Sequence, residues 1–131
     1  WSSDVCSSDL EYAGKRPILG VCLGHQAIGE AFGAQLKNLE DVYHGVATRI
    51  NITQPDYIFD TLGRELEVGR YHSWIVDNNG LPDCIEITAT DNNGQIMALK
   101  HKEFDVHGVQ FHPESVLTPA GETIVKNFLN K

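Results

Sequence analysis

The stretch that decides the fold of this chain is Pro17-Ile18-Leu19-Gly20-Val21-Cys22-Leu23-Gly24-His25. Residues 17–21 are apolar and led by a proline, which predicts a short buried strand. Residues 25–32 predict a helix, and Gly33 is placed to end it. A strand that turns sharply into a helix at Gly-x-Cys-x-Gly is typical of a nucleophile elbow, here with cysteine in place of serine. The pattern predicts that the Cys22 thiol lies over a helix N-terminus, where unpaired N–H groups favour a thiolate and bind oxyanions.

These residues alone leave one alternative open, a buried cysteine in an ordinary strand–helix turn. His25 and Gln26 follow Cys22 in the first helical turn. No acidic residue stands near His25 in the sequence, which favours a packing or capping histidine over a catalytic one. Gln26 is one helical turn past Cys22, so its amide could reach a ligand at the thiol.

Composition places the chain among small globular domains. It has 131 residues, 41% hydrophobic and 21% charged, which suits a single core. The formal net charge is −8 and no basic run occurs, which argues against nucleic acid or an anionic membrane surface as partner. No stretch is long and apolar enough to span a bilayer. Cys22 and Cys84 lack a metal-type spacing, and a working thiolate implies a reducing compartment, so we expect a cytoplasmic protein.

The first ten residues do not fit the rest of the chain. They read Trp1-Ser2-Ser3-Asp4-Val5-Cys6-Ser7-Ser8-Asp9-Leu10, with a doubled Ser-Ser-Asp and no amphipathic period. They resemble the translation of a sequencing-library adapter, and the alternative is a genuine polar tail. We therefore expect residues 1–10 to lie outside the fold, and residues 11–131 to form one partial domain whose native chain would begin upstream.

The remaining chain predicts a layered fold. Strands are expected at residues 44–52, 84–90, 95–101 and 106–111. Asn93-Gly94 is a strong hairpin signal between two of these strands. Residues 34–43 form a mixed connector, residues 68–76 combine strand formers with a polar cluster, and a helix over residues 120–129 has Thr118 as its expected cap. We therefore expect an α/β fold with a mostly parallel sheet flanked by helices and an antiparallel section around the hairpin. The site is expected at the carboxyl ends of the parallel strands.

His112-Pro113-Glu114 carries the second part of the predicted chemistry. Residues two apart in extended chain point the same way, and Pro113 ends the strand, so an imidazole and a carboxylate can lie side by side. Cys22 would then be the nucleophile, His112 would take and return the proton, and Glu114 would orient the imidazole. Two alternatives remain: a plain loop, and a zinc site built from His72, His107 and His112.

Three separated motifs, taken together, resemble the class I (triad-type) glutamine amidotransferases. They are residues 20–26, residues 71–74 and residues 108–115, which read Gly-Val-Cys-Leu-Gly-His-Gln, Tyr-His-Ser-Trp and Gly-Val-Gln-Phe-His-Pro-Glu-Ser. Their common order makes the resemblance specific, and it runs from about Lys15 to the C-terminus. Residues 114–121 resemble the chorismate-using branch of this class, which supplies the glutaminase component (component II) of anthranilate synthase and its relative in aminodeoxychorismate synthesis.

The resemblance implies a flavodoxin-like fold and a complete reaction. Cys22 would attack the side-chain amide of L-glutamine, release ammonia and form a thioester, which water would hydrolyse with His112 as base and Glu114 behind it. The remaining implied contacts with glutamine and its oxyanion come from the Leu23 N–H, Gln26, Ser73 and the Trp74 backbone. The ammonia would pass to a chorismate-binding synthase subunit (component I), for tryptophan or, alternatively, folate biosynthesis. No cofactor and no metal are implied.

One part of the family pattern is missing. The first strands and a Pro-Gly-Pro-Gly-like loop, which supplies the second oxyanion donor, are absent from this sequence. Losing one such donor costs about 100- to 1000-fold in rate, so this chain is expected to be weakly active or inactive as a fragment. A stand-alone γ-glutamyl hydrolase and a non-catalytic regulatory subunit remain as alternative functions.

Overall fold

A computed structural model describes residues 16–40 and 42–130, so the expectation about residues 1–10 lies outside the described residues. A six-stranded sheet has the order β1-β8-β7-β6-β3-β4, and β2 and β5 form a separate pair. The strands are β1 (Ile18–Val21), β2 (Leu36–Asn38), β3 (Val46–Ile52), β4 (Glu65–Arg70), β5 (Trp74–Val76), β6 (Ile85–Asp91), β7 (Ile96–His101) and β8 (Val106–Val109). The helices are α2 (Leu23–Ala31), the 3₁₀ turn η1 (Tyr57–Phe59) and α3 (Gly121–Leu129).

The α/β fold class is confirmed, but the sheet is mixed and not mostly parallel. Among the described strands only β1 and β8 pair in parallel, and the other neighbours in the sheet pair antiparallel. The physical reason is the length of the connections. Strands β6, β7 and β8 follow one another through loops of four residues, which suffice for hairpins but not for the crossover that parallel pairing needs.

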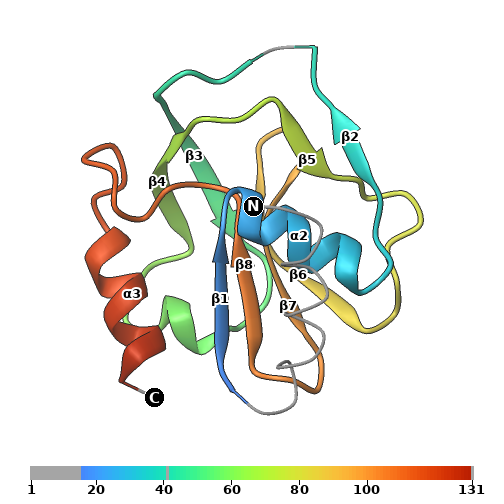
Figure 1. The fold of residues 1–131 in the computed structure, drawn as a ribbon. Coiled ribbons are helices and arrows are strands. Elements are labelled where there is room, and N and C mark those ends of the chain that lie inside the picture. Colours follow the sequence, from blue (N-terminus) through green and yellow to red (C-terminus); the bar gives the residue numbers. More distant parts are fainter. Residues whose placement is uncertain (1–15, 41, 131) are drawn as a thin grey trace.

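Two hydrophobic clusters cover the two faces of the sheet. One contains Ile58 from η1 and Ile124 from α3, and the other contains Ile28 from α2. Ile96 and Met97, neighbours in β7, belong to different clusters, as successive side chains of a strand should. Figure 1 accordingly shows α2 and α3 on either side of the β1–β8 pair. No helix in the described ranges combines the length and the apolarity that crossing a bilayer requires.

Two local expectations were wrong. The connector 34–43 contains a strand, β2, which forms by pairing with β5, a segment distant in sequence, so no local pattern marks it. Thr118 does not cap α3, whose N-cap is Ala120 with no side-chain hydrogen bond. The Thr118 hydroxyl instead donates to the His112 carbonyl at 2.7 Å and accepts the Gly69 N–H at 2.9 Å. It therefore ties the segment after β8 to strand β4.

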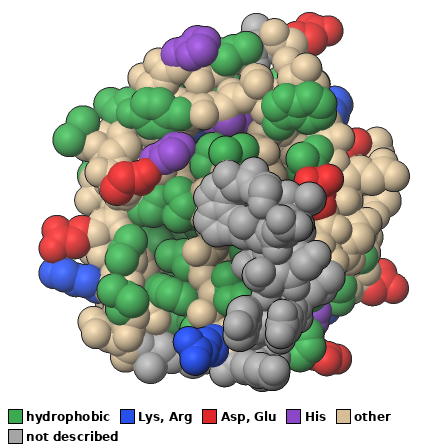
Figure 2. Space-filling model, viewed as in Figure 1, with side chains coloured by type: hydrophobic (Ala, Val, Ile, Leu, Met, Phe, Trp, Pro, Cys, Tyr) green, Lys and Arg blue, Asp and Glu red, His purple; other side chains and the backbone are tan. Residues whose placement is uncertain are grey.

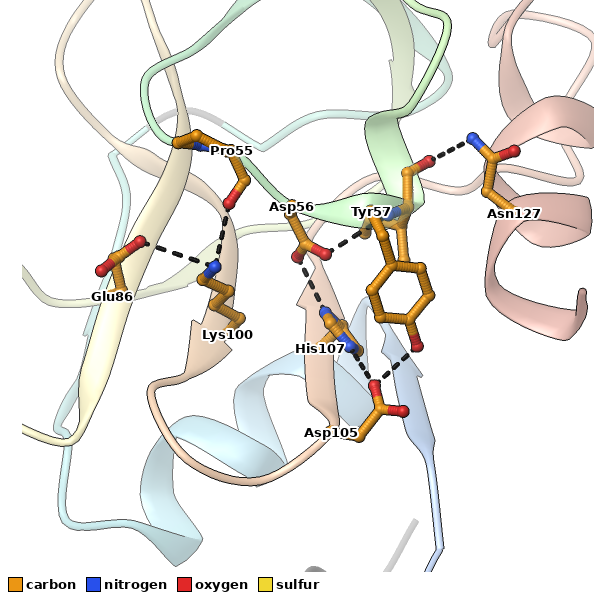
Figure 3. Close-up of polar contacts among 9 residues, drawn as sticks. Pro55, Asp56, Tyr57, Glu86, Lys100, Asp105, His107 and Asn127 are labelled. Atoms are coloured by element: carbon orange, nitrogen blue, oxygen red, sulfur yellow. Dashed lines mark hydrogen bonds and ion pairs between the residues drawn. The ribbon is translucent and has the colours of Figure 1, made fainter. Parts of the chain in front are cut away.

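His107 lies in a buried polar cluster near the start of β8 (Figure 3). Its Nδ1 is 2.8 Å from Asp56 Oδ2, and its Nε2 is 2.6 Å from Asp105 Oδ1, which also accepts the Tyr57 hydroxyl. Burial alone would lower the pKa of His107, but the hydrogen bonds and charges of Asp56 and Asp105 outweigh it and raise the pKa above 6.5. The imidazolium therefore links η1 to β8.

This cluster predicts a pH-dependent contribution to stability. A histidine with a raised folded-state pKa stabilises the fold fully below its unfolded-state pKa, near 6.5, and loses that effect as the pH rises through the folded-state pKa. We expect the His107→Gln variant to be less stable than the wild type in thermal unfolding at pH 6, with a smaller deficit at pH 9. His44→Gln, at an exposed histidine, is the control. A His107→Gln deficit that is equal at both pH values would contradict the prediction.

Candidate active site

The predicted elbow is present at Cys22. Strand β1 ends at Val21 and α2 begins at Leu23, so Cys22 is the N-cap, with φ 54° and ψ −101°. Its N–H donates to the Val109 carbonyl at 2.8 Å, which fastens the turn to β8. A Cβ on Gly20 would lie 2.6 Å from the Gly24 carbonyl carbon, so this turn needs glycine. The strained conformation of Cys22 is the kind that clusters at functional sites.

The elbow opens into a cavity of about 850 Å³. Every site residue named from the sequence lines it: Cys22, Leu23, Gln26, Ser73, Trp74, His112 and Glu114. Residues Tyr71, His72, Ser115 and Val116 complete the wall with Val21. Several of these side chains are exposed apolar groups, and Figure 2 shows hydrophobic side chains beside histidine and acidic ones on the upper part of this face. Segments far apart in the sequence therefore meet around one thiol.

His112 and Glu114 form the predicted pair. His112 Nδ1 and Glu114 Oε1 are 2.5 Å apart, so Nε2 is the ring nitrogen that can exchange a proton elsewhere. The ring packs edge-on against Tyr71 at 5.0 Å, and the Tyr71 hydroxyl is 2.9 Å from Ser115 Oγ. The His112 N–H donates to the Gly69 carbonyl at 3.1 Å. These contacts hold the imidazole on the cavity wall. A plain loop would not need to fix a histidine side chain in this way.

The other two imidazoles near the elbow are neutral at pH 7. Burial lowers the pKa of His25 to about 3, although the nearby Gly108 backbone favours the protonated ring. Neither ring nitrogen of His25 has a partner with hydrogen-bond geometry among the described residues, which fits the packing role expected from the sequence. Burial, and then the charge of Arg70, lower the pKa of His72 to about 4. Of the three, His112 alone is paired with a carboxylate in the cavity.

The groups around Cys22 shift the pKa of its thiol in opposite directions. Burial raises its pKa, as does the charge of Glu114, while hydrogen bonds from the Leu23 N–H and the Gln110 side chain act in the opposite direction. The net effect is a raised pKa. The thiol therefore needs a base to become the thiolate, and the Leu23 N–H already points at the place where negative charge would develop.

Gln26 lines the cavity, and its NH₂ group is bound within the protein. Its Nε2 donates to the Trp74 carbonyl at 2.9 Å and to Gln110 Oε1 at 3.3 Å, so both amide hydrogens are used within the protein. Its side chain is buried and lies at the edge of the cavity. Gln110, a fully buried amide directly after β8, was not among the site residues predicted from the sequence. One signal for Gln110 was available: its amide lies within residues 106–111, which predict a buried strand. A buried polar group requires a hydrogen-bond partner, so this side chain had to meet another polar group.

The zinc arrangement is not formed. His107 is bound by Asp56 and Asp105, whereas His72 and His112 line the cavity. Among the described residues, no group of three or more His, Cys, Asp or Glu side chains could hold a metal ion.

Comparison with known proteins connects this geometry to a family. A family profile described as glutamine amidotransferase class-I matches residues 6–131. Aminodeoxychorismate synthase component 2 of Klebsiella aerogenes is 46% identical over 120 residues, 92% of this chain and 64% of that protein. Anthranilate synthase component 2 of Pseudomonas putida is 46% identical over 127 residues, 93% of this chain and 64% of that protein. The chain thus spans just under two thirds of the length of these relatives.

A solved structure gives the same result for the fold. A Thermoplasma acidophilum protein described as part of a GMP synthase matches with a TM-score of 0.85 and 31% sequence identity. The match covers 97% of this chain and 63% of that chain. The elbow and the surrounding mixed sheet therefore belong to an architecture found in solved relatives.

Proposed function

This chain belongs to the class-I glutamine amidotransferase family, and from that premise we propose that it hydrolyses L-glutamine to glutamate and ammonia. The observation that carries the proposal is the cavity lined both by Cys22 on its elbow and by the His112–Glu114 pair. A nucleophile, a base and an orienting carboxylate are the groups that covalent acyl transfer needs.

The proposed reaction assigns one task to each group. His112 Nε2 takes the thiol proton, and the Cys22 thiolate attacks the carboxamide carbon of glutamine. The Leu23 N–H stabilises the oxyanion, and His112 passes the proton to the departing ammonia. Water, deprotonated by His112, then hydrolyses the thioester and releases glutamate. Glu114 stabilises the imidazolium in both steps. Gln26, Ser73 and the backbone of Trp74 hold the substrate's α-amino and carboxylate groups.

We further propose that the ammonia serves a chorismate-binding synthase subunit. Relatives named anthranilate synthase component 2 and aminodeoxychorismate synthase component 2 match at equal identity. Anthranilate synthesis for tryptophan is the proposal, and aminodeoxychorismate synthesis for folate is the alternative. A reactive thiolate suits a reducing compartment, so the proposed location is the cytoplasm.

The test is amide-nitrogen transfer. The protein, produced with the upstream segment expected from the sequence, is purified and mixed with a chorismate-binding synthase subunit, chorismate and glutamine labelled with ¹⁵N at the side-chain amide. We expect glutamate release and ¹⁵N in the aromatic amine, whose mass distinguishes anthranilate from aminodeoxychorismate. Release of glutamate from γ-glutamyl peptides by the isolated chain, without transfer, would instead indicate a stand-alone hydrolase. Absence of glutamate release in both assays would overturn the proposal.

A further inference from the structure

The Gln110 amide lies against the sulfur of the proposed nucleophile. Its Nε2 is 3.7 Å from Cys22 Sγ, within hydrogen-bond reach of sulfur, and the side chain is fully buried. Gln110 follows β8 directly, and its backbone N–H donates to the Met97 carbonyl at 2.8 Å. The amide is thus held on the framework of the sheet, two residues before His112.

An amide can present either an N–H or a carbonyl to the sulfur, and here its neighbours decide which. The Trp74 carbonyl can only accept, so Gln26 must turn its NH₂ group toward it, at 2.9 Å. The second hydrogen of the same NH₂ group meets Gln110 at 3.3 Å, so Gln110 must present its carbonyl oxygen there. The NH₂ group of Gln110 therefore faces Cys22.

The Trp74 carbonyl is fixed from its other side by a buried chain of donors. The Arg70 guanidinium can only donate, so the His72 Nε2 that it contacts at 3.0 Å must accept. This leaves the proton on His72 Nδ1, which lies 3.1 Å from the Trp74 carbonyl. Arg70 is held in turn by Asp91 at 3.0 Å. The orientation of Gln110 is therefore set by groups extending to the hairpin that begins at Asp91.

We propose that Gln110 is a catalytic residue that donates an amide hydrogen bond to the Cys22 thiolate, and that Gln26, His72 and Arg70 are positioning residues that keep this donor facing the sulfur. The assignment rests on the proposed function of the same site. A donor aimed at the sulfur stabilises the charged form relative to the thiol and so offsets part of the cost of burying that charge. Arg70, which does not line the cavity, thus supports residues that do.

Alkylation of Cys22 by iodoacetamide, followed from pH 6 to pH 10, tests the donor without glutamine. Cys6→Ser and Cys84→Ser provide the background, leaving one thiol. Gln110→Leu removes the donor, and Gln110→Glu keeps the shape but places a carboxylate beside the sulfur. We expect the apparent pKa to rise from wild type to Leu to Glu, with alkylation of the Leu variant at pH 7 about tenfold slower. The limiting rate at high pH should be unchanged.

Thr88→Val is the matched control, since Thr88 is also buried and its hydroxyl has no hydrogen-bond partner among the described residues. The alkylation rate of Cys22 in this variant should depend on pH as it does in the wild type. Positioning by His72 is tested with His72→Phe, which should shift the profile in the same direction as Gln110→Leu. The proposal would be overturned if folded Gln110 variants showed the same dependence of alkylation rate on pH as the wild type. It would also be overturned if their apparent pKa values did not follow the expected order. A shifted profile in a protein without glutaminase activity would contradict only the proposed function.

Discussion

Replacing Cys22 with serine is expected to lower kcat for glutamine hydrolysis by about 10⁴-fold or more, as removal of a covalent nucleophile does in other hydrolases. The change preserves the size of the side chain, so the elbow with its φ of 54° should be retained. The hydroxyl is not ionised at neutral pH, whereas a thiol can be converted to a thiolate by a neighbouring imidazole. Glutamate release, measured for the purified protein with its synthase subunit, gives the loss.

The same variant separates catalysis from folding. Ammonia-dependent synthesis by the partner subunit should survive, because ammonia then bypasses the Cys22 thioester. Cys84→Ser is the matched control: Cys84 is partly buried beside the cluster that contains Ile28 and does not line the cavity. It should retain glutamine-dependent activity. Normal glutamine hydrolysis by the Cys22→Ser protein would exclude the thioester mechanism.

Replacing His112 with asparagine is expected to lower kcat by about 10³-fold. The imidazole would act in both half-reactions, first on the thiol proton and then on water, and asparagine can do neither. Glu114→Gln should cause a smaller loss. The Glu114 side chain is 65% exposed, so solvent screens the charge that stabilises the imidazolium. Single-turnover measurements should show that thioester formation is slowed in the His112→Asn protein.

His44→Asn provides the control for this prediction, since it makes the same replacement at an exposed histidine outside the cavity. Its kcat should equal that of the wild type. Burial, together with the charge of Arg70 for His72, lowers the pKa values of His25 and His72 to about 3 and 4, so both are too weakly basic to substitute for His112. A kcat for His112→Asn within tenfold of the wild type would therefore contradict the assigned base.

Features with short sequence spacing could be predicted. The elbow at Cys22 follows from two glycines between an apolar run and a helix, and the hairpin follows from Asn93-Gly94, where Gly94 has a φ of +78°. His112 and Glu114 are the predicted pair, but they meet within a turn in which the Ser115 N–H donates to the His112 carbonyl at 3.2 Å, and not in the extended chain expected from the sequence. Each of these depends on the backbone conformation of a few adjacent residues, which local residue preferences specify.

The sequence by itself determined the α/β class, the turn that raises the Cys22 thiol, and the presence of His112 and Glu114 in the same cavity. The tertiary structure alone decided the mixed pairing of the sheet, the strand β2, and the use of Thr118 to tie the segment after β8 to β4. It also decided that Gln110 presents an N–H to the sulfur. The physical reason is that pairing and amide orientation depend on partners distant in sequence: Gln26 is 84 residues from Gln110, and Arg70 is 21 residues from Asp91.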